Sequence, residues 1–320
     1  PGLSDLDFTW HADGRDDYGG DVLLADLPPH SRIQCDVDLN GSVRFKRTRL
    51  IDRPKDTNLL VILIDDVGVD VLEAYELGDV VAHTPTLDGL AGDGVTFTRV
   101  YAQPNCSPAR GTLLTGRQPY QHGVGTALPV SGWYGLPLEE ETLPELLARA
   151  GYANAALGKW HLGTTNTAYL DHPNLSGFDH YAGTLIGLNN DSATDLLTQD
   201  YWDWEKVTDG VAERTTVYAT TDIANDMITE MSELPEPWVI FAATAAAHTP
   251  FHFPPDDLWS GDLVGDTVSA QQYLAMLEAV DTEIGRALDT MDPDVRDRTT
   301  IIVVGDNGTP MKSGLVPPTA

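Results

Sequence analysis

The sequence predicts an α/β protein with a doubly wound, mostly parallel β-sheet, helices on both faces of that sheet and a β-rich extension at the N-terminus. Two observations lead to this fold class. Four apolar runs lack the alternation of half-buried strands, which is typical of strands covered on both faces. Segments with apolar residues at helical spacing separate these runs. Alternating strands and helices favour a parallel sheet, because each helix carries the chain back to the edge where the next strand starts.

Residues 1–53 have a different pattern from the rest of the chain. In the stretch "RIQCDVDLNGSVRFKRTRL", apolar and polar residues alternate on either side of Asn40-Gly41, a pair typical of a two-residue hairpin turn. We therefore predict a β-hairpin, in which Cys35 is a packed residue of the buried face rather than a reactive thiol. The domain prediction is a β-rich extension over 1–53 and a main domain over 54–320.

The main domain is predicted to contain four strands with helices between them. The strands are, in chain order, "NLLVILIDD", "GYANAALGKWH", "PWVIFAATAAAH" and "TTIIVVGDNG". The helices are "ARGTLLTG", "TLPELLARAG", "TVYATTDIANDMITEMSE" and "SAQQYLAMLEAVDTEIGRALDTM". We expect Ser107 to cap the first helix, with Pro108 in its first turn. Thr142 and Glu145 have the spacing of a capping box at the start of the second helix.

The composition excludes several classes of function. Lys and Arg number 19 and Asp and Glu number 49, so the formal net charge is −30. Nucleic-acid binding requires clustered cations, so we exclude nucleic acid as a partner and interpret the charge as an acidic, solvated surface. No apolar run approaches the ~20 residues of a membrane span, and two cysteines do not make a disulfide framework. The chain starts at Pro1 with no visible signal peptide, so we expect a fragment of a longer protein.

Polar side chains follow each of the four predicted strands. They are Asp65 and Asp66 after the first strand, Lys159 and His161 after the second, His248 after the third, and Asp306 and Asn307 after the fourth. Ligands of open α/β sheets bind outside the carboxyl ends of the strands, so we expect these side chains to meet at one edge. The Asp and Asn oxygens suit Ca²⁺ or Mg²⁺ rather than zinc, for which no Cys/His cluster competes.

Cys106 lies at the predicted start of a helix, in the stretch "NCSPARGTLLTGR". The positive end of the helix dipole, together with Arg110 one turn later, predicts a lowered pKa for this thiol. A thiolate nucleophile is therefore one interpretation of Cys106, and a buried structural cysteine is another.

"CSPAR" followed by "LLTGR" resembles the Cys-x-Pro-x-Arg motif of the type I sulfatases, which carries their formylglycine. Five further stretches are similar to that family and follow its order. They are "LLVILIDDVG", "HTPTLDGLAGDGVTFTRVYA", "GYANAALGKWHLG", "AAHTP" and "TTIIVVGDNG". The resemblance covers roughly residues 56–310. It implies an alkaline phosphatase-like fold and hydrolysis of a sulfate ester, with Cys106 oxidised to formylglycine by the formylglycine-generating enzyme.

The resemblance also implies a role for each polar residue of the predicted site. Asp65, Asp66, Asp306 and Asn307 would hold Ca²⁺, which also contacts the formylglycine made from Cys106. The hydrate of that aldehyde would offer one hydroxyl to attack sulfur and a second to expel sulfate.

The remaining implied roles concern substrate and protons. Arg110 would orient the formylglycine, and Lys159 would bind sulfate. His161 would take the proton of the second hydroxyl. His248 would contact sulfate or the leaving-group oxygen, also as a general acid. Asp306 would assist deprotonation of the attacking hydroxyl.

The sequence departs from the family pattern after the fourth strand. A second sulfate-binding lysine is expected there, but the chain runs "DNGTPMKSGLVPPTA" and stops. We expect that lysine beyond Ala320, with Lys312 as the substitute within this chain. The main domain would then be a sulfatase catalytic domain without its C-terminal part.

Several alternatives stay open at this point. The chain is a calcium-dependent sulfatase, a phosphonate or phosphate ester hydrolase of the same superfamily, or an inactive sulfatase-like fragment. The substrate would be a sulfated small molecule or a glycan, bound by family analogy between loops such as 164–215. Trp202 and Trp204 in that segment would either stack on a sugar or pack in the core. Family analogy further implies a periplasmic or secreted protein.

Overall fold

The computed structural model describes the backbone of residues 31–37 and 43–49 and all atoms of residues 57–188 and 199–315. The chain divides into two compact units, Pro1–Thr57 and Asn58–Ala320. In the first unit, β1 (Ser31–Val37) pairs antiparallel with β2 (Val43–Arg49), as predicted. The Asn40-Gly41 turn and the packing of the Cys35 side chain lie outside the described residues.

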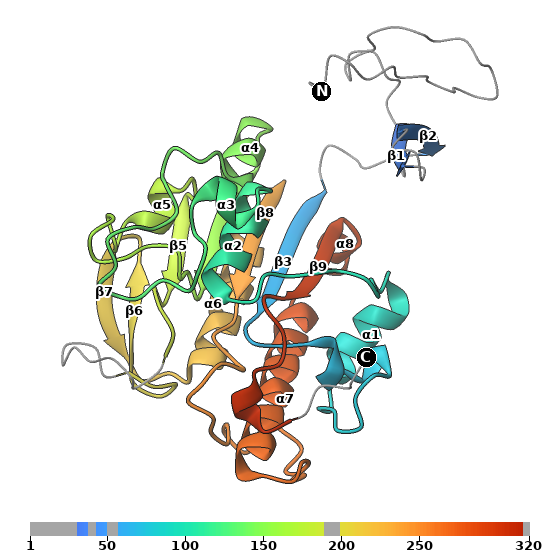
Figure 1. Cartoon of the computed structure of the whole chain (residues 1–320), viewed down its shortest axis with the longest axis vertical. Helices are drawn as coiled ribbons and strands as arrows, with labels where there is room; N and C mark the ends of the chain where they lie inside the picture. Colours follow the sequence, from blue (N-terminus) through green and yellow to red (C-terminus); the bar gives the residue numbers. More distant parts are fainter. Residues whose placement is uncertain (1–30, 38–42, 50–56, 189–198, 316–320) are drawn as a thin grey trace, which may run out of the picture. The chain divides into compact units, whose positions relative to one another are not determined.

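The second unit contains a seven-stranded sheet. Its strands are β3 (Asn58–Ile64), β4 (Ala153–Gly158), β5 (His180–Gly183), β6 (Trp204–Thr208), β7 (Val211–Thr215), β8 (Trp238–Ala243) and β9 (Thr299–Gly305). Their order is β7-β6-β5-β4-β8-β3-β9 (Figure 1). The strands β5, β4, β8, β3 and β9 are neighbours in this order and pair in parallel. At the other edge of the sheet, β6 pairs antiparallel with both β5 and β7. The predicted fold class is confirmed.

Helices cover both faces of this sheet (Figure 1). They are α1 (Pro85–Asp93), α2 (Cys106–Thr115), α3 (Pro119–His122), α4 (Leu143–Arg149), α5 (His172–Leu175), α6 (Ala219–Glu233), α7 (Val268–Asp289) and α8 (Pro293–Asp297), with the 3-10 turns η3 (Val69–Val71), η4 (Glu73–Tyr75) and η5 (Met311–Ser313). Ile62 of β3 shares a buried cluster with Met227 of α6 and Leu277 of α7. Val61, the preceding residue of β3, points to the opposite face of the sheet and lies in a second buried cluster with Leu114 of α2. The sheet is therefore buried on both sides, which explains why its strands lack alternation.

Three local predictions have different outcomes. The capping box of Thr142 and Glu145 is present at the start of α4. The expectation that Ser107 caps α2 is wrong, because Asn105 is the N-cap residue and the Ser107 hydroxyl instead accepts a hydrogen bond from a backbone N–H of a distant loop. Segment 164–215, expected as loops, contains α5, β5, β6 and β7. None of the helices in the described part of the chain is long and apolar enough to cross a bilayer.

Candidate active site

The ends of β3, β4 and β9 and the start of α2 bring five of the predicted residues together. Asp65 and Asp66 follow β3, Lys159 follows β4, and Asp306 follows β9. Cys106 is the first residue of α2. One ligand atom from each of the three aspartates and from Cys106 lies within 4.8 Å of the others, and all four residues are buried. The carboxyl edge of the sheet therefore forms a compact polar cluster, as the strand endings predict.

Two glycines allow the chain to place Lys159 and Asp306 at this edge. Gly158 has φ +82°, and a Cβ atom there would lie 2.0 Å from the Ala243 carbonyl oxygen. A Cβ atom on Gly305 would lie 2.1 Å from a carbonyl oxygen of the loop after β3. Only glycine avoids these overlaps, so the backbone can pass close to the neighbouring carbonyl groups. This close approach lets the side chains of the next residues, Lys159 and Asp306, enter the cluster. The Gly-Lys and Gly-Asp pairs of the sequence thus have a steric reason.

Arg110 connects the helix to the two strand ends. One guanidinium nitrogen lies 3.2 Å from Asp65 Oδ2 and 3.2 Å from Asp306 Oδ2. Another donates a hydrogen bond to the backbone oxygen of Lys159. Burial alone would lower the pKa of Arg110, but the two carboxylates raise it above its usual value. The side chain is therefore a fixed cation that links the start of α2 to the ends of β3 and β9.

Lys159 supplies a second buried cation next to Cys106. Its ammonium group forms an ion pair with Asp65 and lies 3.7 Å from Cys106 Sγ. Burial would lower the pKa of Lys159, but the Asp65 carboxylate raises it. The group stays charged without exposure to water, which suits recognition of an anion that enters the site.

The carboxylates outnumber the cations within the cluster. Burial would raise the pKa of Asp65, but Lys159 and Arg110 hold it well below its usual range. Burial and the Asp65 charge raise the pKa of Asp66, and they raise that of Asp306 to about 7. With three carboxylates and two cations, one negative charge is left without a partner. Protonation of a carboxyl group or binding of a cation would relieve the repulsion.

The donor set of the cluster fits a hard divalent cation. Beside the three carboxylates, the Asn307 side chain donates to Cys106 Sγ at 3.4 Å, while its Oδ1 atom is buried with no hydrogen-bond partner among the described residues. A buried amide oxygen without a partner is unusual and is costly. Together these groups are oxygen ligands of the type that Ca²⁺ or Mg²⁺ prefers. The residues present therefore could hold a metal ion.

Cys106 lies at the centre of these groups, but its thiol is not activated. Its Sγ atom donates to Asp65 Oδ1 at 3.3 Å. Burial raises the pKa of the thiol, and the lowering effect of Lys159 and Arg110 does not outweigh burial and the nearby carboxylates. The prediction of a lowered pKa is wrong, because the helix start is buried among aspartates that lie far away in the sequence. A thiolate nucleophile is therefore disfavoured.

His161 is a neutral imidazole with one free acceptor. Its backbone is left-handed, with φ +58°, a strained conformation that is enriched at functional sites. Nε2 lies 3.0 Å from the Leu128 carbonyl and acts as the donor. Burial, Lys159 and Arg110 lower the pKa of His161 to about 3. Nδ1 is buried and has no hydrogen-bond partner among the described residues, so it is available to accept a proton.

His248 lies at the rim of the cluster. Its Nδ1 donates to the Thr249 carbonyl at 2.9 Å, and its Nε2 lies 3.9 Å from Asp66 Oδ2. Burial and the Lys159 charge lower its pKa. With Nδ1 committed, Nε2 carries a proton only in the imidazolium form. A role as general acid therefore requires an anion or a carboxylate that favours the charged ring.

Three further residues singled out from the sequence lie outside the cluster. Lys312 is on η5 with an exposed side chain, and within residues 57–188 and 199–315 no hydrogen bond or ion pair joins it to the cluster. Trp204 is 1% exposed and donates its indole N–H to the Val217 carbonyl, so it is a core residue. Trp202 by contrast is 40% exposed.

Residues that the sequence did not single out support the loops that carry Asp66 and Asp306. The Tyr273 hydroxyl donates to the Asp66 carbonyl at 2.8 Å. Thr309 accepts from the Gly68 backbone N–H at 3.2 Å and donates to Asp70 Oδ1 at 2.7 Å. These bonds tie the loop after β3 to α7 and to the loop after β9. No local pattern identifies Tyr273, because its partner is distant in the chain.

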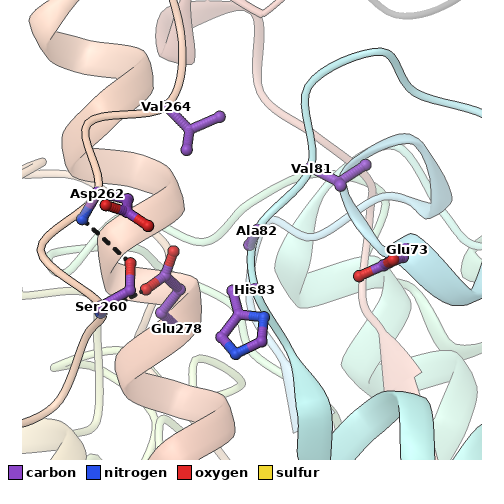
Figure 2. Close-up of a pocket in the computed structure, with 8 residues that line it drawn as sticks. All are labelled: Glu73, Val81, Ala82, His83, Ser260, Asp262, Val264 and Glu278. Atoms are coloured by element: carbon purple, nitrogen blue, oxygen red, sulfur yellow. Dashed lines mark hydrogen bonds between the residues drawn. The ribbon is translucent and has the colours of Figure 1, made fainter.

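A small pocket of about 150 Å³ lies between the segments around His83 and Ser260 (Figure 2). None of the residues that line it belongs to the cluster. Glu278 lines it, but its carboxylate already accepts the Ser260 backbone N–H at 2.7 Å. The pocket is thus separate from the candidate active site.

Comparison with known proteins gives one consistent result. Residues 57–318 match the Sulfatase family. N-acetylgalactosamine-6-sulfatase of Homo sapiens is 32% identical over 279 residues, which cover 80% of this chain and 50% of that protein. Arylsulfatase G of Rattus norvegicus is 30% identical over 304 residues, which cover 85% of this chain and 53% of that protein. The chain spans about half the length of these curated relatives.

Solved structures show a similar architecture. The crystal structure of Ps i-CgsB aligns with a TM-score of 0.70 and 26% identity, covering 82% of this chain and 61% of that chain. It has also been solved in complex with k-i-k-neocarrahexaose. A structure in complex with its substrate D-glucosamine-2-N,6-O-disulfate aligns with a TM-score of 0.60 and 22% identity, covering 79% of this chain and 66% of that chain. This second likeness concerns the fold.

Proposed function

Because this chain belongs to the sulfatase family, we propose that the protein containing it hydrolyses a sulfate ester at Cys106, after conversion of that residue to formylglycine. The observation that carries the proposal is the set of contacts around Cys106 Sγ. A carboxylate, an ammonium group and an amide all lie within 3.7 Å of this atom. A nucleophile made at this position would face both the metal ligands and the anion-binding cation.

The proposed metal is Ca²⁺, held by Asp65, Asp66, Asp306 and Asn307. The excess negative charge and the unpartnered Asn307 oxygen support this assignment. When bound, the ion would stabilise negative charge on sulfate oxygens and favour the ionised nucleophile. Arg110 would keep Asp65 and Asp306 in place for it.

The proposed chemistry divides between the nucleophile and its neighbours. As its hydrate, the formylglycine made from Cys106 would supply one hydroxyl to attack sulfur and one to release sulfate. Lys159 would bind the sulfate group, because it is a buried cation 3.7 Å from the Cys106 side chain. His248 would contact sulfate or the leaving oxygen. The negative charge of the ester would raise the pKa of His248 and so favour its imidazolium form.

Proton transfer is assigned to two residues. His161 Nδ1 is a neutral, buried acceptor and would take the proton of the hydroxyl that releases sulfate. Asp306, whose pKa is raised to about 7, would assist deprotonation of the attacking hydroxyl. Asp306 has a pKa near neutral pH, as a general base should. His161 is a weak base at a pKa of about 3, so its role would depend on the negative charge of the bound sulfate, which favours the protonated ring.

Substrate, partners and location are inferred from the relatives. One relative is an N-acetylgalactosamine-6-sulfatase, and one structural neighbour was solved in complex with k-i-k-neocarrahexaose. We therefore propose a sulfated glycan as substrate. Maturation would require the formylglycine-generating enzyme, and the mature protein would be periplasmic or secreted.

The domain proposal is an extension over 1–53 and a sulfatase catalytic domain over 54–320 that continues in the complete protein. The chain spans about half of its curated relatives, which supports such a continuation. The second sulfate-binding lysine would then lie beyond Ala320. Lys312, exposed on η5, is the weaker candidate for this role.

The test is expression of the complete protein with the formylglycine-generating enzyme, followed by mass spectrometry of the "CSPAR" peptide and assays on aryl sulfate, phosphodiester and phosphonate esters. We expect the mass loss of a thiol-to-aldehyde conversion and the fastest turnover on the sulfate. Cys106→Ala should abolish turnover, whereas Cys35→Ala should not change it. Conversion of Cys106 without turnover of any ester would identify a non-catalytic protein, and faster phosphonate cleavage would identify a phosphonate hydrolase.

A further inference from the structure

A cluster of aromatic rings lies beside the loop that follows β8. The ring of His252 is 4.4 Å from that of Tyr201, 4.5 Å from that of Trp202 and 5.7 Å from that of Tyr218, between ring centroids. His252 Nδ1 lies 2.8 Å from the Pro250 carbonyl and donates to it. Nε2 therefore accepts the Tyr218 hydroxyl, 2.9 Å away. Both ring nitrogens are bonded within the cluster, so His252 fixes the rings around it.

The ring cluster is connected to the candidate active site. The Tyr201 hydroxyl lies 2.7 Å from the carbonyl oxygens of both Ala245 and His248. The strand β6, which starts at Trp204, runs antiparallel to β5. Its start therefore lies at the carboxyl edge of the parallel strands, where the catalytic cluster lies. Trp202, just before this start, belongs to the same edge.

Trp202 is the solvent-facing member of the ring cluster. It is 40% exposed, whereas Tyr201 and Tyr218 are buried. The carboxylate of Asp200 accepts the backbone N–H of Trp202 at 2.8 Å and that of Asp203 at 2.9 Å, which fixes the turn that carries the indole. Trp202 therefore offers a preformed aromatic surface, packed from behind by other rings.

We propose that Trp202 is the platform on which a sugar ring of the glycan substrate stacks, next to the sulfated ring. This inference rests on the proposed function. Sugar rings present C–H groups on their faces, and these pack well on an indole. Because the turn and the rings behind it already hold the indole, little side-chain freedom is lost on binding. An aryl sulfate has no neighbouring sugar and gains nothing from the platform.

The experiment compares kinetics on two substrates in the complete, matured protein. Trp202→Ala should raise KM for k-i-k-neocarrahexaose or for an oligosaccharide of 6-O-sulfated N-acetylgalactosamine about five- to tenfold, with kcat unchanged. The kinetic constants for 4-nitrophenyl sulfate should not change. Trp202→Phe keeps a ring and should restore most of the affinity. Tyr120→Ala removes an exposed aromatic ring on α3, the helix that follows α2 in the chain, and serves as the matched control.

Binding without turnover separates this inference from the proposed function. Protein expressed without the maturing enzyme keeps the Cys106 thiol, and calorimetry on it should show the same loss of oligosaccharide affinity in Trp202→Ala. Equal effects on the glycan and the aryl sulfate would show a structural role and overturn the platform. No binding of either oligosaccharide by the wild-type protein would also overturn it. A matured protein that turns over no sulfate ester would refute the proposed function, while calorimetry would still decide the platform.

Discussion

Replacing Arg110 by Met would leave two buried carboxylates without their guanidinium partner. In the wild-type chain the distances from one guanidinium nitrogen to Asp65 and Asp306 are both 3.2 Å, and all three side chains are almost fully buried. Removing one member of a buried ion pair costs about 3–5 kcal/mol, because the desolvated partner is left uncompensated. For a domain of this size, a loss of that magnitude lowers the midpoint of thermal unfolding by about 6–20 °C.

The assay is thermal unfolding followed by circular dichroism, in chelator so that no metal ion replaces the lost charge. The control is Arg117→Met, which breaks a partly exposed ion pair to Glu140 with distances of 2.6 and 2.9 Å. That change should cost at most about 1 kcal/mol. A second variant, Arg110→Met combined with Asp306→Asn, removes one of the orphaned charges and should recover part of the loss. If Arg110→Met lowered the midpoint no more than Arg117→Met, the electrostatic account of the cluster would be refuted.

Three further predictions concern the metal, a glycine and a histidine. Ca²⁺ at about 100 times its dissociation constant should stabilise the folded protein by about 2.7 kcal/mol in a melting assay, and Asp66→Ala should remove this effect while Asp88→Ala keeps it. Gly158→Ala should destabilise the fold by several kcal/mol, because the added Cβ would lie 2.0 Å from a carbonyl oxygen and because φ is +82° at this position. A Cβ on Gly125 would meet nothing within 4 Å, so Gly125→Ala should be nearly neutral in the same melting assay. Burial lowers the pKa of His252 from 6.5 to about 4. Between these two pH values the unfolded chain binds a proton that the folded chain does not, so stability is lost as the pH falls through this range. His252→Gln should reduce the slope of stability against pH in this range, measured by urea unfolding at several pH values, while His161 and His248 maintain the rest of it. An unchanged slope would contradict the assignment.

The parallel core was predictable because its signal is local. β3 and β8 are buried on both faces, so each appears in the sequence as an uninterrupted apolar run. The residues that follow β3, β4, β8 and β9 could be collected at one edge by topology alone, since parallel strands share their carboxyl ends. The capping box of α4 was predictable for the same reason, because its two members are three residues apart.

The features that escaped prediction depend on contacts between distant segments. β7 is mostly exposed and β5 has four residues, so neither produces a periodic pattern. The pKa of Cys106 follows from burial beside aspartates of other strands, which the local helix start does not reveal. The structure also distinguished Trp202 from Trp204, two residues with the same sequence context but very different exposure.

β9 carries Asp306 and Asn307 at its end, but it is also the outermost strand of the described sheet. It pairs with β3 on one side, and Ile302 and Val303 expose apolar surface on its two faces. An apolar strand with one unpaired edge is a template for intermolecular β-pairing. A concentrated preparation of this chain alone should therefore self-associate through β9. Such aggregates would distort the loop that carries Asp306 and Asn307, two of the four proposed metal ligands. A dilution series of the Ca²⁺-binding assay would separate this loss of binding from a defect in the ligands themselves.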